Sequence, residues 1–269
     1  MDPFLSLPLE LVEEILSYVE GYSPVLRGVS STWKEIINSR KRKAYKIEDL
    51  SLRGNISIIQ WIHRVRPLTS RFLNQGMAYA ARGGHKDLVL LFKEWGATKF
   101  DWGMAYAAGE GHKDLVLLFK EWDTLQITQG TTDFNQGMIN AASGGHKDLV
   151  VLFKEWGATE IDWGMAYAAS RGHKDVVLLF KEWGANNFNL GMADAAAGGH
   201  KDLVILFKEW GATNFNWAMT YAAEGGHKDL VLLFKKWGAT NFNRGMADAA
   251  EGNHKDLVVL FKEWGAKDK

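Results

Sequence analysis

A string of thirteen residues that returns almost unchanged constrains the fold of this chain more than any other feature. It first appears as HKDLVLLFKEWGA at 85–97, and six more copies follow. Each copy begins with a histidine, and the intervals between these histidines are 27, 34, 27, 27, 27 and 27 residues. A fixed period of this length indicates a stack of supersecondary units. The histidines are His85, His112, His146, His173, His200, His227 and His254.

Each copy predicts two short helices. The first contains GMAYAA or a variant of it and ends at a glycine such as Gly83. The second contains KDLVLLFKEW and ends at Gly96, and a short polar linker such as TNFN leads to the next copy. With Leu88 at 0° and about 100° per residue, one side of the second helix is apolar. That side contains Leu88, Val89, Leu91, Phe92 and Trp95, and the opposite side contains Lys86, Asp87, Lys93 and Glu94.

Two such helices cannot bury an apolar face alone, so we predict that neighbouring repeats stack and bury it together. We expect the recurring tryptophan to form a ladder in the core, because a large aromatic ring buries much apolar area. Its members are Trp95, Trp122, Trp156, Trp183, Trp210, Trp237 and Trp264.

The repeat region spans 46–269 in this interpretation. Residues 46–69 match the pattern weakly, as a degenerate repeat that caps the stack, and seven clear repeats occupy 75–269. The long interval contains an insertion of 34−27=7 residues, DTLQITQ at 123–129. Such an insertion fits a finger that makes a contact of its own, and it fits equally a loop that lengthens at little thermodynamic cost.

One aliphatic row lies on the charged side of the second helix. It either forms an outward contact strip or, as we prefer, packs against the adjacent repeat because the helix is rotated. The row consists of Leu90, Leu117, Val151, Leu178, Ile205, Leu232 and Val259.

Differences between the copies predict a binding surface. On the first helix, positions equivalent to 75, 79 and 82 vary and share one face because of their i, i+4, i+7 spacing. Variable side chains that include Trp and Tyr suit the recognition of a protein, and acids toward the carboxyl end suggest a target with a basic stretch. Drift after duplication explains the same variation. The predicted target-binding residues are Trp102, Tyr106, Trp163, Tyr167, Asp194, Trp217, Tyr221 and Asp248.

The composition argues against most chemistry. The chain has no cysteine, and its 32 basic and 32 acidic residues balance, so nothing in bulk attracts nucleic acid or an anionic membrane. No catalytic or phosphate-binding motif occurs. Helices in adjacent repeats lie about 8–10 Å apart, too far for neighbouring histidines to share a zinc ion at about 2.0–2.1 Å. We therefore expect structural histidines and no catalytic residue, metal or cofactor.

The amino terminus does not resemble a secretory signal, and no apolar run is long enough to span a bilayer. We therefore expect a soluble intracellular protein, cytoplasmic by default. The run RKRK at 40–43 suits a solvated helix end better than a nuclear localisation signal. The nucleus remains an alternative location.

The first 45 residues share nothing with the repeats. Ser6 and Ser23 are placed as N-caps, each with a proline near the first helical position, and a third helix carries Trp33. Three short helices make a marginal core, so much of their apolar surface is expected to meet a partner.

The segment LPLELVEEILSYV…SPVLRGVSSTW resembles an F-box. This resemblance implies docking to a Skp-family adaptor and, through it, to a cullin–RING ubiquitin ligase. The alternative is a three-helix cap over the first repeat. The residues implied in the adaptor interface or its support are Leu7, Pro8, Leu11, Ile15, Leu16, Leu26, Val29 and Trp33.

The repeat itself, AAxGGHKDLVLLFKEWGA, resembles the ankyrin repeat, a family whose pattern is Ala-Ala, Gly-His, Val-x-x-Leu-Leu and Gly-Ala. Its period of 27 is about six residues short of the usual 33, so the projecting hairpin is largely missing. The combination resembles F-box and ankyrin-repeat proteins of large DNA viruses, particularly the giant viruses of amoebae, whose site of action would be the host cytoplasm.

The sequence therefore predicts an all-α chain, with a three-helix F-box at 1–45 and an ankyrin-like solenoid of 27-residue repeats at 46–269. Without cysteine, a part in ubiquitin transfer is one of positioning. The predicted function is recognition of a substrate protein for a cullin–RING ligase. The alternative is a protein-binding scaffold without a role in ubiquitylation.

Overall fold

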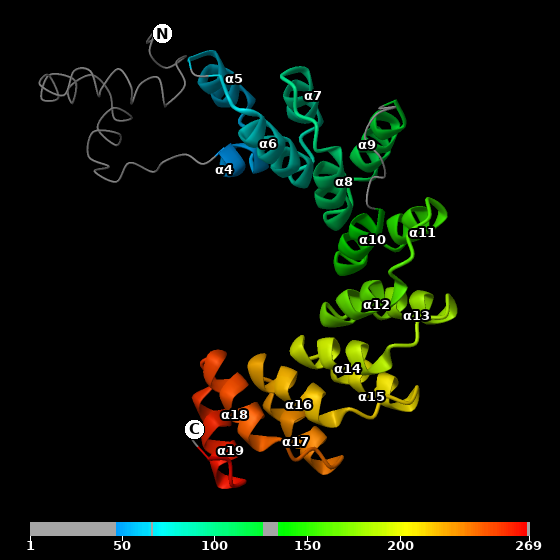
Figure 1. Ribbon diagram of the computed structural model, residues 1–269, viewed down its shortest axis with the longest axis vertical. Helices are drawn as coiled ribbons and strands as arrows, with labels where there is room; N and C mark the ends of the chain where they lie inside the picture. Colours follow the sequence, from blue (N-terminus) through cyan, green and yellow to red (C-terminus); the bar gives the residue numbers. More distant parts are fainter. Residues whose placement is uncertain (1–46, 66, 126–133, 268–269) are drawn as a thin grey trace, which may run out of the picture. The chain divides into compact units, whose positions relative to one another are not determined.

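The structure, a computed structural model, describes residues 47–65, 67–125 and 134–267 (Figure 1). Every regular element in these ranges is an α-helix, and helices adjacent in sequence pack serially. The predicted all-α repeat fold is thus confirmed for the described residues. The predicted three-helix segment at 1–45 lies outside them.

Each clear repeat contributes a pair of antiparallel helices, as its sequence predicts. The first helices of the pairs are α6 (Ser70–Arg82), α8 (Phe100–Gly109), α10 (Phe134–Ser143), α12 (Ile161–Ser170), α14 (Phe188–Ala197), α16 (Phe215–Glu224) and α18 (Phe242–Glu251). The second helices are α7 (Lys86–Glu94), α9 (Lys113–Leu125), α11 (Lys147–Glu155), α13 (Lys174–Glu182), α15 (Lys201–Glu209), α17 (Lys228–Lys236) and α19 (Lys255–Glu263).

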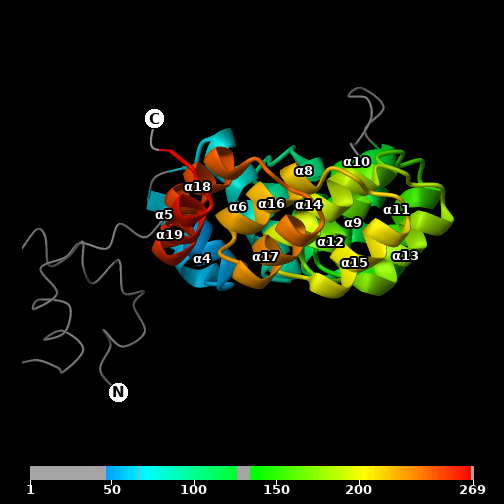
Figure 2. The same ribbon diagram turned by 90° about the horizontal axis from the view of Figure 1, so that it is seen from below.

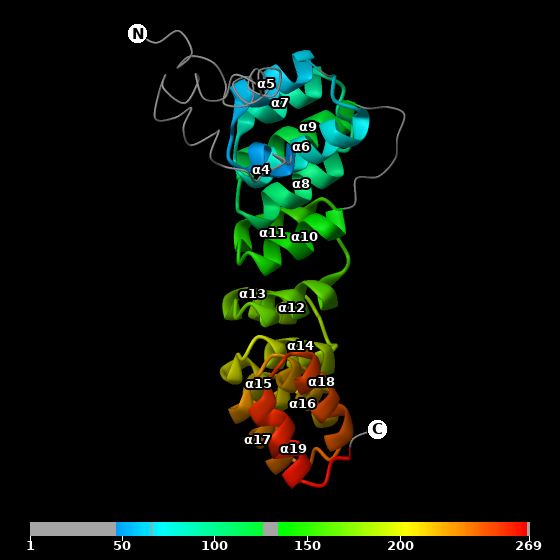
Figure 3. The same cartoon turned by 90° about the vertical axis from the view of Figure 1, so that its left-hand side faces the viewer.

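The described residues fall into two compact units, one ending at Gly103 and the other beginning at Met104, so that the boundary lies within α8. In the first unit, two further helices precede α6, namely α4 (Ile47–Leu52) and α5 (Ile56–Val65). Helix α4 packs along α6, as Figure 3 shows, and buries Ile47 and Leu50. These helices coincide with the segment predicted as a degenerate repeat.

In the second unit, the helices from α10 onward form two layers (Figures 1 and 2). The first helices pack closely on one another, α10 on α12, α12 on α14, α14 on α16 and α16 on α18. This close approach is possible because their contacting positions are small, as at the fully buried Ala193 and Ala196. The second helices form the other layer and carry the large apolar side chains.

Glycine determines where the second helices end. Gly96 and its equivalents adopt a positive φ, for example 104° at Gly211, a left-handed conformation that stops a helix with little strain only at glycine. The insertion replaces this glycine with Asp123, and α9 accordingly continues to Leu125. Residues 126–129 of the insertion lie outside the described part of the chain.

Phenylalanine, not tryptophan, forms the core ladder. The seven phenylalanines of the repeated string are completely buried, whereas the tryptophans are half-buried except Trp122. Each tryptophan stacks edge-on against the phenylalanine three residues before it, as for Phe207 and Trp210 with ring centroids 5.3 Å apart. The prediction of a tryptophan core ladder is therefore wrong. The buried side of the helix centres on the phenylalanine, and the tryptophan lies at its edge.

The same rotation exposes the aliphatic row. Leu178 and Ile205 are 39% and 40% exposed, and Leu232 is 46% exposed. The prediction that this row packs against the adjacent repeat is wrong, because the row points almost directly away from the phenylalanines and all its members except the half-buried Val151 are exposed. The outward strip, the other interpretation, describes what the structure shows.

We expect the free energy of unfolding to change by less than about 0.5 kcal/mol when Leu178 or Ile205 is replaced by Gln, because an exposed side chain loses little on substitution. Denaturant titration measures this directly. A loss above about 1.5 kcal/mol in either variant would show that the row is packed.

Histidine links each repeat to the one before it. The ring Nε2–H donates a hydrogen bond, with N–O distances of 2.9–3.2 Å, to the carbonyl of the last residue of the preceding first helix. Such carbonyls have no partner within their own helix. The structural interpretation of the histidines is thereby confirmed for these rings. The pairs are His85 with Leu52, His146 with Gly109, His173 with Ser143, His200 with Ser170, His227 with Ala197 and His254 with Glu224.

An amide or carboxylate near the start of each first helix holds the linker that follows the same repeat. Asn189 Oδ1 accepts hydrogen bonds from the backbone N–H groups of Thr213 and Asn214, at 2.9 and 2.8 Å. The sequence analysis did not identify this role, although the recurring FN or FD dipeptide was the available signal. The equivalent acceptors are Asn74, Asn135, Asp162, Asn216 and Asn243.

Lysines also connect successive repeats. Lys201 Nζ lies 3.7 Å from Asp229 Oδ2 of the next repeat, an exposed pair of the kind that contributes little stability. Lys181, equivalent to Lys93, lies over the ring of Phe188 in the next repeat, 4.3 Å from its centroid. The lysines expected on a simple solvent-facing side thus form cation–π contacts with the following repeat.

Candidate target-binding surface

The predicted binding face lies on the first helices of the second unit. Each of these helices presents two positions four residues apart, which are neighbours on a helix surface. Trp163 and Tyr167 on α12 are 48% and 45% exposed, and Trp217 and Tyr221 on α16 are half-buried. The helix between them, α14, has the buried Leu190 and the half-buried Asp194 at the same positions. The structure thus brings two aromatic pairs to either side of one carboxylate.

The two aromatic pairs are ordered by contact within each pair. The ring centroids of Trp163 and Tyr167 are 6.5 Å apart, and those of Trp217 and Tyr221 are 5.6 Å apart in an edge-on arrangement. Rings held in this way present a large surface at a small cost in conformational entropy on binding, as protein-binding surfaces require.

Asp194 differs from the other carboxylates of this face. Its side chain is half-buried, and burial raises its pKa from 3.8 to about 6. Among the described residues its carboxylate has no hydrogen-bond or ion-pair partner, and the position four residues earlier on the helix is the aliphatic Leu190. Burying a carboxylate without a partner costs free energy, and the fold does not compensate this cost internally.

Asp248, also predicted to contribute negative charge to a target, is in an ion pair within its own helix. Only 5% of the residue is exposed, and the Nε of Arg244 lies 2.9 Å from its Oδ1. Asp248 was predicted to bind the target, and in the structure a guanidinium one turn earlier on the same helix already pairs with its carboxylate. Exposed acid on this side instead comes from Glu224 and Glu251.

Trp102 and Tyr106, the remaining predicted target-binding residues, both lie exposed on α8. The boundary between the two units falls between them. The surface described below is therefore confined to the second unit. We call it the aromatic–acidic patch and define it as Trp163, Tyr167, Asp194, Trp217 and Tyr221.

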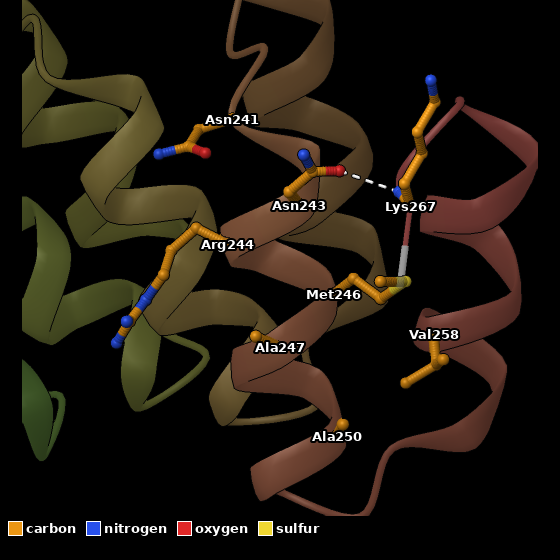
Figure 4. A pocket seen from close by; sticks show the side chains of 8 residues that line it. All are labelled: Asn241, Asn243, Arg244, Met246, Ala247, Ala250, Val258 and Lys267. Atoms are coloured by element: carbon orange, nitrogen blue, oxygen red, sulfur yellow. Dashed lines mark hydrogen bonds between the residues drawn. The ribbon is translucent and has the colours of Figure 1, made fainter. Parts of the chain in front are cut away.

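A hollow of about 470 Å³ lies at the last helix pair, α18 and α19 (Figure 4). Ala247 and Ala250 line it and are exposed, whereas Ala193 and Ala196, their equivalents on α14, are fully buried. Lys267 closes one side through a backbone N–H bond to Asn243 Oδ1 at 2.9 Å. The hollow is thus the stacking face of a repeat, and its shape needs no ligand to explain it.

Within the described ranges, no cluster of three or more His, Asp or Glu side chains is arranged to hold a metal ion. None of the helices there is both long and apolar enough to cross a bilayer.

The eight residues predicted to form or support the adaptor interface lie outside the described residues. They are Leu7, Pro8, Leu11, Ile15, Leu16, Leu26, Val29 and Trp33.

Comparison with known proteins identifies this amino-terminal segment. Residues 4–45 match the family model of the F-box domain. Among solved structures, the human ASB11 ankyrin repeat domain is similar over 80% of this chain and 96% of its own, with 16% sequence identity and a TM-score of 0.37. No curated protein matches the chain.

Proposed function

We propose that this protein is a substrate-recognition adaptor of a cullin–RING ubiquitin ligase. Residues 4–45 dock to a Skp-family adaptor, and the repeats hold a target protein. The match of residues 4–45 to the F-box domain is the observation that carries this proposal. The helical repeats with an exposed, variable aromatic face support the second half of it.

In this role the protein contributes proximity. By holding the target beside a ligase whose other subunits carry ubiquitin, it converts an encounter between two molecules into a reaction within one complex. Its contribution to the rate then depends on how firmly both ends are held.

The experiment that tests the proposal is direct binding of the purified full chain to Skp-family adaptors. Amoebal adaptors come first because of the resemblance to proteins of giant viruses. A variant with Pro8→Ala, Leu11→Ala and Trp33→Ala should bind at least about thirtyfold more weakly, because truncating a central interface residue typically costs 2 kcal/mol or more. Isothermal calorimetry gives the dissociation constants.

The matched control is Trp163→Ala with Tyr167→Ala, on the aromatic–acidic patch far along the sequence from residues 4–45. We expect this variant to bind the adaptor as tightly as the unmodified chain. Circular dichroism and thermal melting establish that both variants fold. Failure of the unmodified chain to bind any of the adaptors contradicts the ligase role, and the function would then be that of a protein-binding scaffold.

A further inference from the structure

On the first helices of the second unit, the two side chains four residues apart interact with each other, with one exception. Gln136 Nε2 donates to Asn140 Oδ1 at 2.8 Å on α10. The aromatic pairs of α12 and α16 contact each other, and on α18 Arg244 pairs with Asp248. Only α14 sets a carboxylate, that of Asp194, against an aliphatic side chain, that of Leu190.

None of the basic side chains around α14 forms an ion pair with Asp194 in the described part of the chain. Arg171, the exposed residue that directly follows α12, is unpaired there. Lys201 and Lys208 of α15 contact the next repeat, at Asp229 and Trp237.

The sequences of α12, α14 and α16 contain no lysine or arginine, and their carboxylates are Asp162, Asp194 and Glu224. Asp162 already accepts two backbone hydrogen bonds from the linker, from Asn186 and Asn187. The face therefore presents the Asp194 carboxylate with aromatic rings on the neighbouring helices and no cation paired with it among the described residues.

We propose that the Asp194 carboxylate, with the aromatic pairs of α12 and α16, is the binding site for one arginine side chain of the target protein. This inference rests on the proposed function, because it names the group by which the target is recognised. The partner it requires is a protein with an exposed arginine.

Aromatic rings on both sides favour a guanidinium. Axes of packed helices are about 8–10 Å apart, so a ring that leans along the face can come within the roughly 6 Å at which cation–π attraction acts on a cation at Asp194. A guanidinium is planar, stacks on aromatic faces and can donate two parallel hydrogen bonds to one carboxylate.

The protein itself contains an example of the proposed interaction. On α18, Asp248 holds the position equivalent to Asp194. The Nε of Arg244 lies 2.9 and 3.1 Å from the two carboxylate oxygens of Asp248. In that repeat the arginine comes from the same helix. On α14, Leu190 holds the position equivalent to Arg244, so the arginine must come from the partner protein.

The test uses the full chain labelled with 5-fluorotryptophan and titrated with N-acetyl-arginine amide, followed by fluorine NMR. Trp163→Phe and Trp217→Phe variants assign the two relevant signals. We expect both signals to shift in a saturable manner at millimolar concentrations. N-acetyl-citrulline amide, which has nearly the same shape without the charge, should leave them unchanged.

Two variants connect the response to the carboxylate. Asp194→Asn should raise the dissociation constant about tenfold, because it removes the ionised acceptor while preserving shape. Leu190→Arg should abolish the response, because it reproduces the Arg244–Asp248 pair on α14 and fills the site from within. Thermal melting verifies folding, and if Leu190→Arg does not fold, Asp194→Asn decides alone.

Any of three results overturns the arginine site: no saturable shift, an equal response to citrulline amide, or an unchanged dissociation constant in Asp194→Asn. Tighter binding of N-acetyl-lysine amide than of the arginine probe also overturns it, in favour of a lysine. Adaptor binding through residues 4–45 is measured separately. If it persists while the patch does not respond, the arginine site is wrong and the adaptor role stands.

Discussion

Replacing Phe207 by Ala is expected to lower the free energy of unfolding by about 3–5 kcal/mol, because the substitution leaves a cavity in the middle of the core ladder. Phe207 is fully buried on α15, and its ring fills the space beside Gly191 of α14. Each repeat is stabilised mainly by its neighbours, so the second unit should also unfold less cooperatively. Denaturant titration measures the loss, and hydrogen exchange shows where the cooperativity breaks.

The control for this prediction is Trp210→Ala, three residues later on the same helix. Trp210 is half-buried at the edge of the same cluster, beside Phe207 and Phe188. We expect the loss of this larger ring to lower the free energy of unfolding clearly less than the loss of Phe207 does. Much of the tryptophan's area is in contact with water, so its removal leaves no closed cavity. A greater loss from Trp210→Ala would restore the tryptophans as the core ladder.

Replacing Asp194 by Asn is expected to stabilise the fold by about 1–2 kcal/mol at pH 7, although it weakens arginine binding. Burial raises the pKa of this carboxyl to about 6, whereas 3.8 is its ordinary value. The folded protein therefore binds a proton more tightly than the unfolded chain, and its stability falls as the pH rises from about 4 to about 6. Above that range the cost is complete, and Asn removes it. At pH 4 the gain should vanish.

The ionisable groups on helices packed against α14 do not offer another explanation of that effect. On α15, Lys201 and Asp202 form ion pairs with Asp229 and Lys174, Lys208 lies over the Trp237 ring, and Glu209 is exposed. Asp162 accepts hydrogen bonds from the linker, and Arg171 and Glu224 are exposed at the ends of α12 and α16.

The control is Asp248→Asn, the same substitution at the equivalent position of α18. It removes a carboxylate that Arg244 already neutralises, so we expect a loss of about 1 kcal/mol at pH 7 rather than a gain. Thermal melts of both variants between pH 4 and pH 8 separate the two cases. A pH-independent stability difference for Asp194→Asn would contradict the burial of an ionised group there.

A residue whose removal stabilises a protein is a common sign of function, since binding sites often hold groups that the fold alone would not favour. Opposite effects of Asp194→Asn on stability and on binding would therefore support the patch more strongly than either alone.

The helices could be predicted from the sequence because their causes are local. A spacing of apolar residues near 3.6, a glycine able to adopt positive φ at Gly96, and a recurring period require only the chain itself. Comparison of the copies with one another also identified the variable positions, among them Trp163 and Asp194, because stacking residues cannot vary freely. The end of α9 also has a local cause, because Asp123 stands where the other copies have the glycine that ends the helix, and α9 is longer than the other second helices.

The orientation of each helix was decided by tertiary packing. The periodicity placed Phe207 and Trp210 on one apolar side and could not say which of the two side chains is buried completely. Small residues on the first helices, such as Gly191, leave room for a phenylalanine ring, and that room fixes the rotation. The exposure of Ile205 follows from the same rotation.

The sequence by itself determined the period, the helix pairs, the F-box segment and the face that varies. Only the tertiary structure showed what the recurring polar residues of the repeat do, because His200 and Asn189 form hydrogen bonds with backbone groups 24 to 30 residues away. It also distinguished Asp194 from Asp248, which hold equivalent positions in the repeat. Charge, burial and pKa depend on the groups that neighbouring elements bring within a few ångströms, and the order of residues along one helix does not fix those groups.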